Sequence, residues 1–184
     1  RLQNHIEILH ADVESGISEI IYDETEEKYI SEASDDMITY LENGKEFLLI
    51  SERDGWKHIW LYNYMDKAFE LITKGEYDIN KFLGFDEKNQ ILYYSSHERS
   101  VIQSDIYSIH LREGNKKLLT EREGWNEAVF VGDFNYFVHT WSNVNTPDVI
   151  TLRDKRGRLI RTIENNTGLV QRMKRFNFNE VSFF

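Results

Sequence analysis

The sequence predicts an all-β fold, because one pattern of strand-like segments recurs along the chain. Three apolar runs begin at Phe47, Ile91 and Tyr136, so that their starts lie 44 and 45 residues apart. Each run is followed by a polar turn and by two further strand-like segments. A period in the mid-forties with four strands per unit is the size of one β-propeller blade. We therefore expect Phe47, Ile91 and Tyr136 to occupy equivalent positions on the second strands of successive blades.

The hydrophobic pattern also changes from strand to strand within each unit. The second strands, around 47–50 and 91–94, are continuously apolar. Such runs are typical of strands that are buried on both faces. The outermost segments, 69–71 and 159–163, alternate or mix polar with apolar residues. This gradient favours a propeller over a β-sandwich, in which both sheets should alternate.

The predicted fold is therefore a partial β-propeller: three complete four-stranded antiparallel blades, half a blade and a short C-terminal helix. The predicted segments are the outer half of a blade at 1–28, complete blades at 29–75, 76–123 and 124–166, and a helical exit at 167–184. Closed propellers carry four to eight blades. We therefore expect the chain to be a fragment of a larger ring.

Turn signals separate the predicted strands. In the half blade, Glu14-Ser15-Gly16 joins strands at 5–9 and 17–22. In the first complete blade, Asn43-Gly44 ends the strand at 37–41, and both residues tolerate the positive φ of a hairpin turn. The corresponding turns of the next two blades are Asn89-Gln90 and Gly132-Asp133.

After Asn165 the pattern changes from strand to helix. Thr167 is a plausible N-cap, and apolar residues then recur at helical spacing, namely Leu169, Val170, Met173 and Phe176. This pattern predicts a short amphipathic helix that leaves the propeller. The residues from 177 to 184 turn apolar again and predict the start of a following strand or domain.

Composition limits the possible functions. The chain has 184 residues, of which 40% are hydrophobic, enough for a sizeable core. Its net charge of −10, with scattered lysines and arginines, argues against nucleic acid as a partner. The absence of cysteine excludes disulfides, thiol catalysis and cysteine-ligated zinc.

No motif predicts a catalytic centre in this chain. Arg53-Asp54-Gly55-Trp56 and Arg122-Glu123-Gly124-Trp125 look like one repeated motif. The strand register, however, places the first in a hairpin and the second between blades, which favours packing roles. The six histidines form no His-x-x-x-His pair, and the glycines frame no nucleophile elbow or P-loop. We therefore expect no catalytic, metal or cofactor-binding residue.

The order of the blade motifs resembles the dipeptidyl peptidase IV group of serine exopeptidases. The run from Ser51 to Tyr62, SERDGWKHIWLY, is similar to the Ser-Glu-x-Asp-Gly-aromatic-x-His blade signature of that group. Similar segments follow in the same order, namely ITKGEYD at 72–78, LYYSS at 92–96, DIYSI at 105–109 and LT at 119–120. The exit at 163–166 before a helix also resembles the point where that family leaves its propeller.

The resemblance implies a parent enzyme with an eight-bladed propeller that covers an α/β-hydrolase domain. Such an enzyme removes N-terminal dipeptides, typically with proline or alanine second, through a Ser-Asp-His triad. Neither the triad nor the paired glutamates that bind the substrate ammonium match residues of this chain. Where relatives carry an Arg-Phe pair near the pocket, this chain has Tyr29-Ile30-Ser31-Glu32-Ala33. Tyr29, Ser31 and Glu32 are therefore the candidates for lining the substrate chamber.

The resemblance also implies partners and a location. We expect an extended peptide substrate of the parent enzyme, contacts with the missing hydrolase domain and remaining blades, a homodimeric parent, and a periplasmic or cell-envelope location. The chain alone is expected to be inactive. The alternative is a non-catalytic propeller that binds protein or carbohydrate, and the sequence following Phe184 distinguishes the two. A stand-alone β-sandwich fits the period least well.

Overall fold

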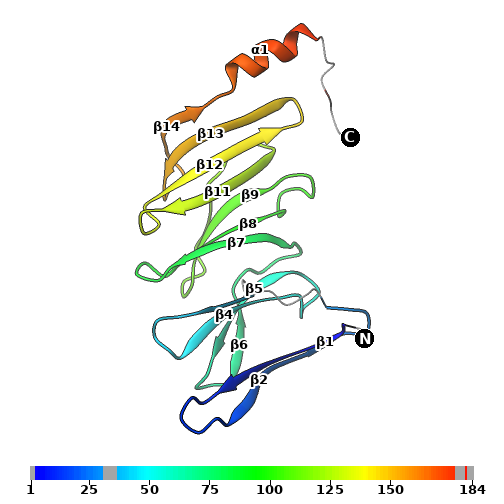
Figure 1. Ribbon diagram of the computed structural model, residues 1–184, viewed down its shortest axis with the longest axis vertical. Helices are drawn as coiled ribbons and strands as arrows, with labels where there is room; N and C mark the ends of the chain where they lie inside the picture. The colour runs from blue at the N-terminus through cyan, green and yellow to red at the C-terminus, as the bar shows by residue number, and fades with distance from the viewer. Residues whose placement is uncertain (1–2, 31–36, 177–180, 182–184) are drawn as a thin grey trace. The chain divides into compact units, whose positions relative to one another are not determined.

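The computed structural model describes residues 3–30, 37–176 and 181. In this part of the chain, fourteen strands and one helix form three four-stranded sheets and one two-stranded sheet (Figure 1). The pairings between neighbouring strands in the sheets are antiparallel. The chain divides into two compact units, residues 1–74 and 75–184.

The first unit contains the two-stranded sheet and one four-stranded sheet. Its strands are β1 (His5–Ala11), β2 (Ser18–Thr25), β3 (Ile38–Tyr40), β4 (Glu46–Ser51), β5 (His58–Asn63) and β6 (Ala68–Leu71). Strands β3 to β6 follow one another in the sheet, and β1 pairs with β2. A two-stranded sheet is marginally stable alone. It is anchored here by Tyr22, which joins a buried cluster with Phe47, Leu49 and Tyr62.

The second unit contains two four-stranded sheets and the helix. The first sheet consists of β7 (Ile79–Asp86), β8 (Ile91–Ser96), β9 (Asp105–His110) and β10 (Lys116–Leu118). The second sheet consists of β11 (Trp125–Val131), β12 (Tyr136–Asn143), β13 (Thr146–Asp154) and β14 (Leu159–Glu164). Their shared core contains Tyr93 and Ile106 from one sheet, Ala128 and Phe137 from the other, and Leu119 from the connection.

The three four-stranded sheets repeat with a period of 45 residues, and this corrects one predicted equivalence. Phe47, Ile91 and Tyr136 all lie on second strands, as expected. However, the cross-strand pairs Tyr40–Phe47, Phe85–Leu92 and Phe130–Phe137 show that Phe47 corresponds to Leu92 and Phe137. All three of these second-strand side chains are fully buried.

The mismatch arises at Glu46, which begins β4 although it is charged. Glu46 is only 6% exposed, and its carboxylate accepts hydrogen bonds from the side-chain amides of Asn43 and Asn63. These donors allow a carboxylate to occupy a buried strand position. The apolar run therefore begins one residue after the strand itself begins.

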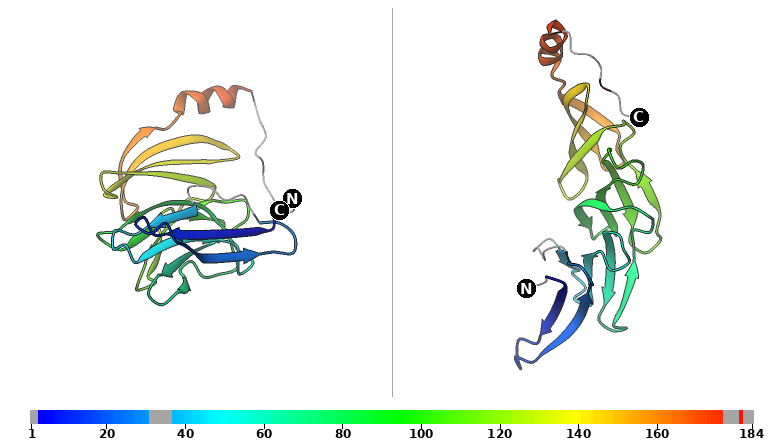
Figure 2. Two further views of the ribbon diagram at one scale, coloured as in Figure 1. Left: turned by 60° about the horizontal axis from the view of Figure 1, so that its bottom comes forward. Right: turned by 90° about the vertical axis from the view of Figure 1, so that its right-hand side faces the viewer.

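The helix α1 spans Thr167–Arg175 and contains no buried residue. Its N-cap is Asn166, in a left-handed conformation with φ of 53°, and not Thr167 as predicted. The Thr167 hydroxyl instead donates to the side chain of Asn165. Figure 2 shows the helix (red) extending from the end of β14.

Most of the segment predicted to turn apolar after the helix lies outside the described residues, apart from Val181. Within the described part of the chain, no helix has the length and apolar character needed to cross a membrane.

Candidate functional site

Of the three residues predicted to line the substrate chamber, Tyr29 lies among the described residues. Tyr29 lies in the connection between β2 and β3, with 70% of its surface exposed. Its neighbour Ile30 is tied by its backbone N–H to the carbonyl oxygen of Gln3, at 2.8 Å. Ser31 and Glu32 lie outside the described residues. The role of all three remains a prediction.

A groove of about 530 Å³ lies at the hairpin mouths of the second unit. It is lined by the β8–β9 loop at Ile102 and Gln103, by residues 123–125, by the β12–β13 hairpin at 142–144, and by Val181. Two hydrogen bonds of 2.9 Å hold Val181 beside the groove: its backbone N–H donates to Asn145 Oδ1, and Asn145 Nδ2 donates to its backbone carbonyl oxygen.

Trp125 gives the groove its aromatic surface. Trp125 is 41% exposed, its ring lies 5.6 Å from that of His97 in a tilted arrangement, and Nε1 donates to Glu127. The sequence interpretation assigned this tryptophan a packing role and missed its place in a groove. The feature that could have indicated the groove is the length of the β8–β9 loop, which brings residues 102 and 103 alongside the connection between the sheets.

The side chains that line the groove suit ligand binding better than catalysis. Among its described lining residues, Glu123 supplies the carboxylate and Ser142 the hydroxyl group, and no histidine, lysine or cysteine accompanies them. A nucleophilic serine needs an adjacent base to activate it. The exposed indole and the polar side chains of Gln103 and Asn143 instead suit stacking and hydrogen bonding to a peptide or sugar.

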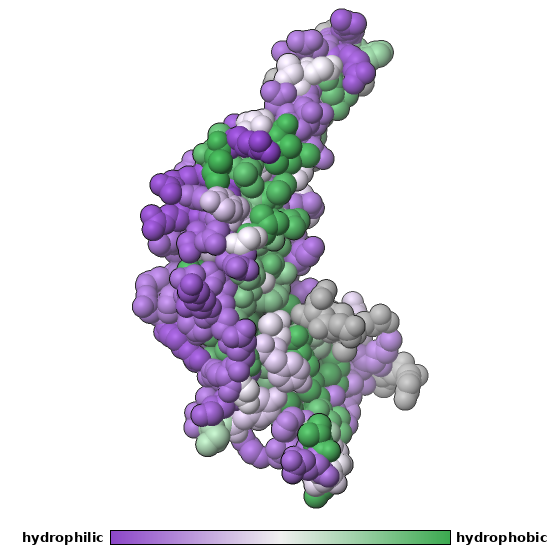
Figure 3. Space-filling model, turned by 60° about the vertical axis from the view of Figure 1, so that its left-hand side comes forward, coloured by the Kyte–Doolittle hydropathy of each residue, from purple (hydrophilic) through white to green (hydrophobic). Residues whose placement is uncertain are grey.

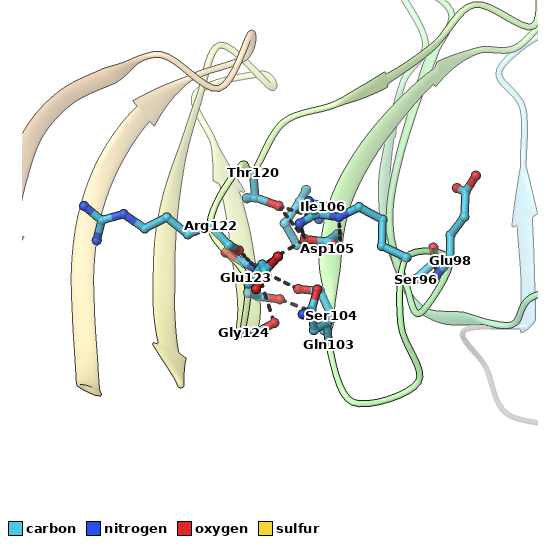
Figure 4. Close-up of polar contacts among 12 residues, drawn as sticks. Ser96, Glu98, Gln103, Ser104, Asp105, Ile106, Thr120, Arg122, Glu123 and Gly124 are labelled. Atoms are coloured by element: carbon cyan, nitrogen blue, oxygen red, sulfur yellow. Dashed lines mark hydrogen bonds and ion pairs between the residues drawn. The ribbon is translucent and has the colours of Figure 1, made fainter. Parts of the chain in front are cut away.

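Next to the groove, Asp105 begins β9 and forms the centre of a buried polar network (Figure 4). The guanidinium of Arg99 binds its carboxylate in a bidentate manner, with distances of 2.6 and 2.7 Å. Two such parallel charge-assisted bonds are strong and directional. They raise the pKa of Arg99, and they anchor the β8–β9 loop to the start of β9.

Asn126 joins the two sheets of the second unit. Its amide donates to the backbone carbonyl oxygens of Ser104, at 2.8 Å, and Arg122, at 3.1 Å. Its backbone N–H also donates to Ser104, and the Ser104 N–H donates to Gly124. Figure 4 shows Ser104 and Gly124 facing each other across this junction. The wall of the groove is therefore held by backbone contacts and does not depend on surface side chains.

His139 continues this network into the second sheet as a neutral imidazole. Nε2 lies 2.9 Å from the Asn126 side-chain oxygen, while Nδ1 accepts a hydrogen bond from Arg153 Nε at 3.1 Å. These partners assign the proton to Nε2. Burial, followed by the charges of Arg153 and Arg122, lowers the pKa of His139 to about 4. A cavity of about 70 Å³ lies beside it, lined in part by the same two arginines.

A separate cluster of polar side chains lies in the first unit. His5 and Glu7 of β1 and Asp23 of β2 place one nitrogen and two carboxylate oxygens within 4.8 Å of one another. The cluster contains no helical histidine pair, so the histidine pattern of the sequence did not predict it. A usable signal was the strand spacing His5-x-Glu7, which places both side chains on one face.

Comparisons with known proteins agree with this architecture. Residues 1–148 match the model of the dipeptidyl peptidase IV (DPP IV) N-terminal region. Dipeptidyl peptidase 4 of Arthroderma otae and of Trichophyton rubrum are each 28% identical over 148 residues, 77% of this chain. The crystal structure of Porphyromonas gingivalis dipeptidyl peptidase 4 superposes on 94% of the chain with a TM-score of 0.83 and 30% identity.

The match covers a small part of each relative. The chain spans about a fifth of the length of the two fungal relatives, 19% in each case, and 24% of the Porphyromonas gingivalis chain. The predicted partial β-propeller is confirmed, because the sheets correspond to those of the known structure. The match to the family model and the similar fold together place this chain in the family of the dipeptidyl peptidase IV N-terminal region.

Proposed function

We propose that this chain is part of the propeller of a serine-type dipeptidyl peptidase and forms one wall of the chamber through which peptides reach the active site. The observation that carries the proposal is the similarity to Porphyromonas gingivalis dipeptidyl peptidase 4 over 94% of the chain. In this proposal the complete protein releases N-terminal dipeptides, and the chemistry is performed by residues of a hydrolase domain outside these 184 residues.

The surface of the last sheet supports a larger assembly. Leu159, Ile160 and Ile163 of β14 are 57%, 48% and 49% exposed. Figure 3 shows apolar surface (green) among polar residues in its upper part, where this sheet lies. Apolar side chains gathered on one strand favour burial against another protein surface. We propose that other parts of the complete protein cover them.

The binding character of the groove agrees with a role in handling peptides. The indole of Trp125 and the amides of Gln103 and Asn143 can contact an extended peptide without cleaving it. Tyr29, Ser31 and Glu32 are proposed, from the family resemblance, to line the substrate chamber of the complete enzyme. We also propose that the complete enzyme is a homodimer located in the periplasm or cell envelope.

Two measurements test the proposal. The first is the gene sequence beyond Phe184, where we expect a Gly-x-Ser-x-Gly elbow followed by an aspartate and a histidine. A further series of blades without that elbow would favour the alternative, a propeller that only binds protein or carbohydrate.

The second measurement compares the 184-residue chain with the complete protein on a chromogenic Gly-Pro amide. We expect hydrolysis by the complete protein and no hydrolysis by the chain alone. Hydrolysis by the chain that persists after removal of host peptidases would contradict the assignment of the chemistry to another domain. Inactivity of the complete protein would contradict the proposed enzyme.

A further inference from the structure

The side chains of His5, Glu7 and Asp23 share one face of the two-stranded sheet β1–β2. His5 and Glu7 are two residues apart on β1, so their side chains point to the same face. Asp23 of β2 is the direct cross-strand partner of Glu7. The pairing of the strands therefore sets the separation of the three side chains.

The distances between these groups are close to those of a metal site. His5 Nε2 lies 2.9 Å from Asp23 Oδ2, in a hydrogen bond that a metal would replace, and 3.8 Å from Glu7 Oε1. All three atoms lie within 4.8 Å of one another. A metal with bonds of about 2.0–2.2 Å to nitrogen and oxygen needs ligand atoms roughly 3.0–3.5 Å apart. Because the three side chains are exposed, small rotations can bring them to these separations.

The negative charge around this cluster favours the binding of a cation. Two carboxylates directly opposite each other on antiparallel strands repel. A single histidine proton can offset only part of that repulsion. The following residues add more negative charge, since 23–27 reads Asp-Glu-Thr-Glu-Glu in a chain with net charge −10. A divalent cation would neutralise both Glu7 and Asp23.

We propose that His5, Glu7 and Asp23 bind one divalent transition-metal ion of the Zn²⁺ class. One imidazole and two carboxylates suit Zn²⁺ and similar ions, with solvent completing the coordination. Ca²⁺ and Mg²⁺ prefer all-oxygen sites, and the imidazole disfavours them. The metal is assigned a structural role, because it links β1 to β2 at the end opposite their hairpin turn.

The structural role follows from the weakness of this sheet. Two strands alone are marginally stable, and a metal would add to the hydrogen bonds that join Asn4 to Glu26 and Gln3 to Ile30 at this end of the hairpin. The connection that follows β2 carries Tyr29, so ordering the sheet also restricts the start of that segment. A metal here would stabilise the first unit independently of the proposed peptidase function.

Calorimetric titration of the complete 184-residue chain, with any affinity tag removed, is the first test. We expect Zn²⁺ to bind with one ion per chain, and a tenfold excess of Ca²⁺ or Mg²⁺ not to displace it. His5→Gln, Glu7→Gln and Asp23→Asn should each weaken Zn²⁺ binding at least about tenfold, as the loss of a ligand requires.

Matched controls come from the same hairpin. Glu14→Gln removes one negative charge at the turn, and His10→Gln removes a histidine from the same strand. Both control variants should bind Zn²⁺ within about twofold of the unchanged chain. Equal weakening by Glu14→Gln would indicate attraction by net charge alone and would overturn the site, as would the absence of Zn²⁺ binding.

Hydrogen exchange supplies a second readout. Adding Zn²⁺ should slow amide exchange in peptides that cover β1 and β2, and Glu7→Gln should abolish this protection. The proposed peptidase function does not predict this result, so the two proposals can fail separately. Protection spread equally over the β11–β14 sheet would contradict a site confined to the first hairpin.

Discussion

The hairpins β4–β5 and β8–β9 have similar loops, but one places an imidazole and the other a carboxylate at the same buried position. His58 and Asp105 each begin the third strand of their sheet, opposite Ser51 and Ser96 respectively, and both are fully buried. Each is held by a residue of its own hairpin loop. His58 Nδ1 lies 2.9 Å from Asp54, whereas Asp105 accepts two bonds from Arg99.

The difference shows that this position requires a partnered polar group and not a particular residue. A threonine stabilises the next backbone N–H in both sheets, since Thr73 accepts from Ile59 and Thr120 accepts from Ile106. The two sheets should nevertheless respond differently to loss of the loop partner. A histidine can become neutral when buried, whereas a carboxylate is costly to bury without its cation.

The largest effect is expected from Arg99→Met, which leaves the buried carboxylate of Asp105 without its cation. Removing one partner of a buried pair costs about 3–5 kcal/mol of unfolding free energy. Urea denaturation should measure this loss. Arg161→Met on the exposed strand β14 is the control, and it should change stability by less than about 0.5 kcal/mol. Equal effects of the two variants would show that Asp105 does not need Arg99.

His139 extends the comparison to a buried histidine whose hydrogen-bond partners are Asn126, Thr151 and Arg153. Its pKa is about 4 in the folded chain and near the ordinary 6.5 when unfolded. Between these values the unfolded chain binds a proton that the folded chain does not. Stability is therefore complete above pH 6.5 and falls as the pH drops toward 4, by about 3 kcal/mol.

The measurement is urea denaturation between pH 7.5 and 4.5, with His139→Gln as the comparison. The variant should lose stability less steeply with falling pH, because carboxylates contribute equally to both chains. Parallel pH profiles would contradict a depressed pKa at this histidine.

The next largest effect is expected from substituting the glycines of the two similar motifs, and the loss of stability should differ between Gly124 and Gly55. An added Cβ at Gly124 would lie 2.4 Å from the carbonyl oxygen of Ser142, whereas one at Gly55 would enter open space. Both glycines have positive φ, 134° and 95° respectively. We expect Gly124→Ala to cost about 2–3 kcal/mol and Gly55→Ala about 1 kcal/mol, measured by thermal unfolding. The reverse order would contradict the close approach at Gly124.

Asp54→Ala tests the contact between Asp54 and His58, which we expect to contribute less to stability than the pair of Arg99 and Asp105. The substitution removes the hydrogen bond to His58, and water can reach the position of the lost carboxylate, whose side chain is 28% exposed. The expected cost is about 1 kcal/mol of unfolding free energy, clearly below that of Arg99→Met. A cost equal to that of Arg99→Met would contradict the weaker contribution of this hydrogen bond.

Thr73→Val and Thr120→Val should have small effects, similar to that of Asp54→Ala. Thr120→Val should be slightly the larger, because the Thr120 hydroxyl also donates to Asp105 at 3.5 Å. Each leaves one backbone N–H, of Ile59 or Ile106, without its hydroxyl acceptor while preserving the volume of the side chain. We expect a loss of about 1 kcal/mol from each, by urea denaturation. A loss at one site more than twice that at the other would show that the two sheets are not equivalent at this position.

Much of the fold could be predicted, because strand and turn signals act over short stretches of chain. The apolar run at Phe47 and the turn at Asn43-Gly44 are readable from neighbouring residues alone. The two similar tetrapeptides were correctly separated by register: residues 53–56 lie in the β4–β5 hairpin, whereas 122–124 lie between β10 and β11 and Trp125 begins β11. The start of β4 was missed at Glu46, because its amide partners are not visible in a hydrophobic pattern.

The site was less predictable, because its residues meet across the chain. Tyr29, Ser31 and Glu32 were predicted from a resemblance to line the substrate chamber, and this role stays a prediction. The groove at Trp125 and the cluster at His5 were not predicted, since each needs the pairing of strands that the local pattern does not specify.

By itself, the sequence determined an all-β chain of four-stranded repeats, because the apolar runs, spaced 44 and 45 residues apart, and the turn residues are local features. Only the tertiary structure decided which polar groups share the interior. Asn126 bonds the backbone of Ser104 across 22 residues, and the pKa of His139 depends on Arg153 and Arg122. Desolvation and charge depend on distance in space, and the folded sheets set that distance.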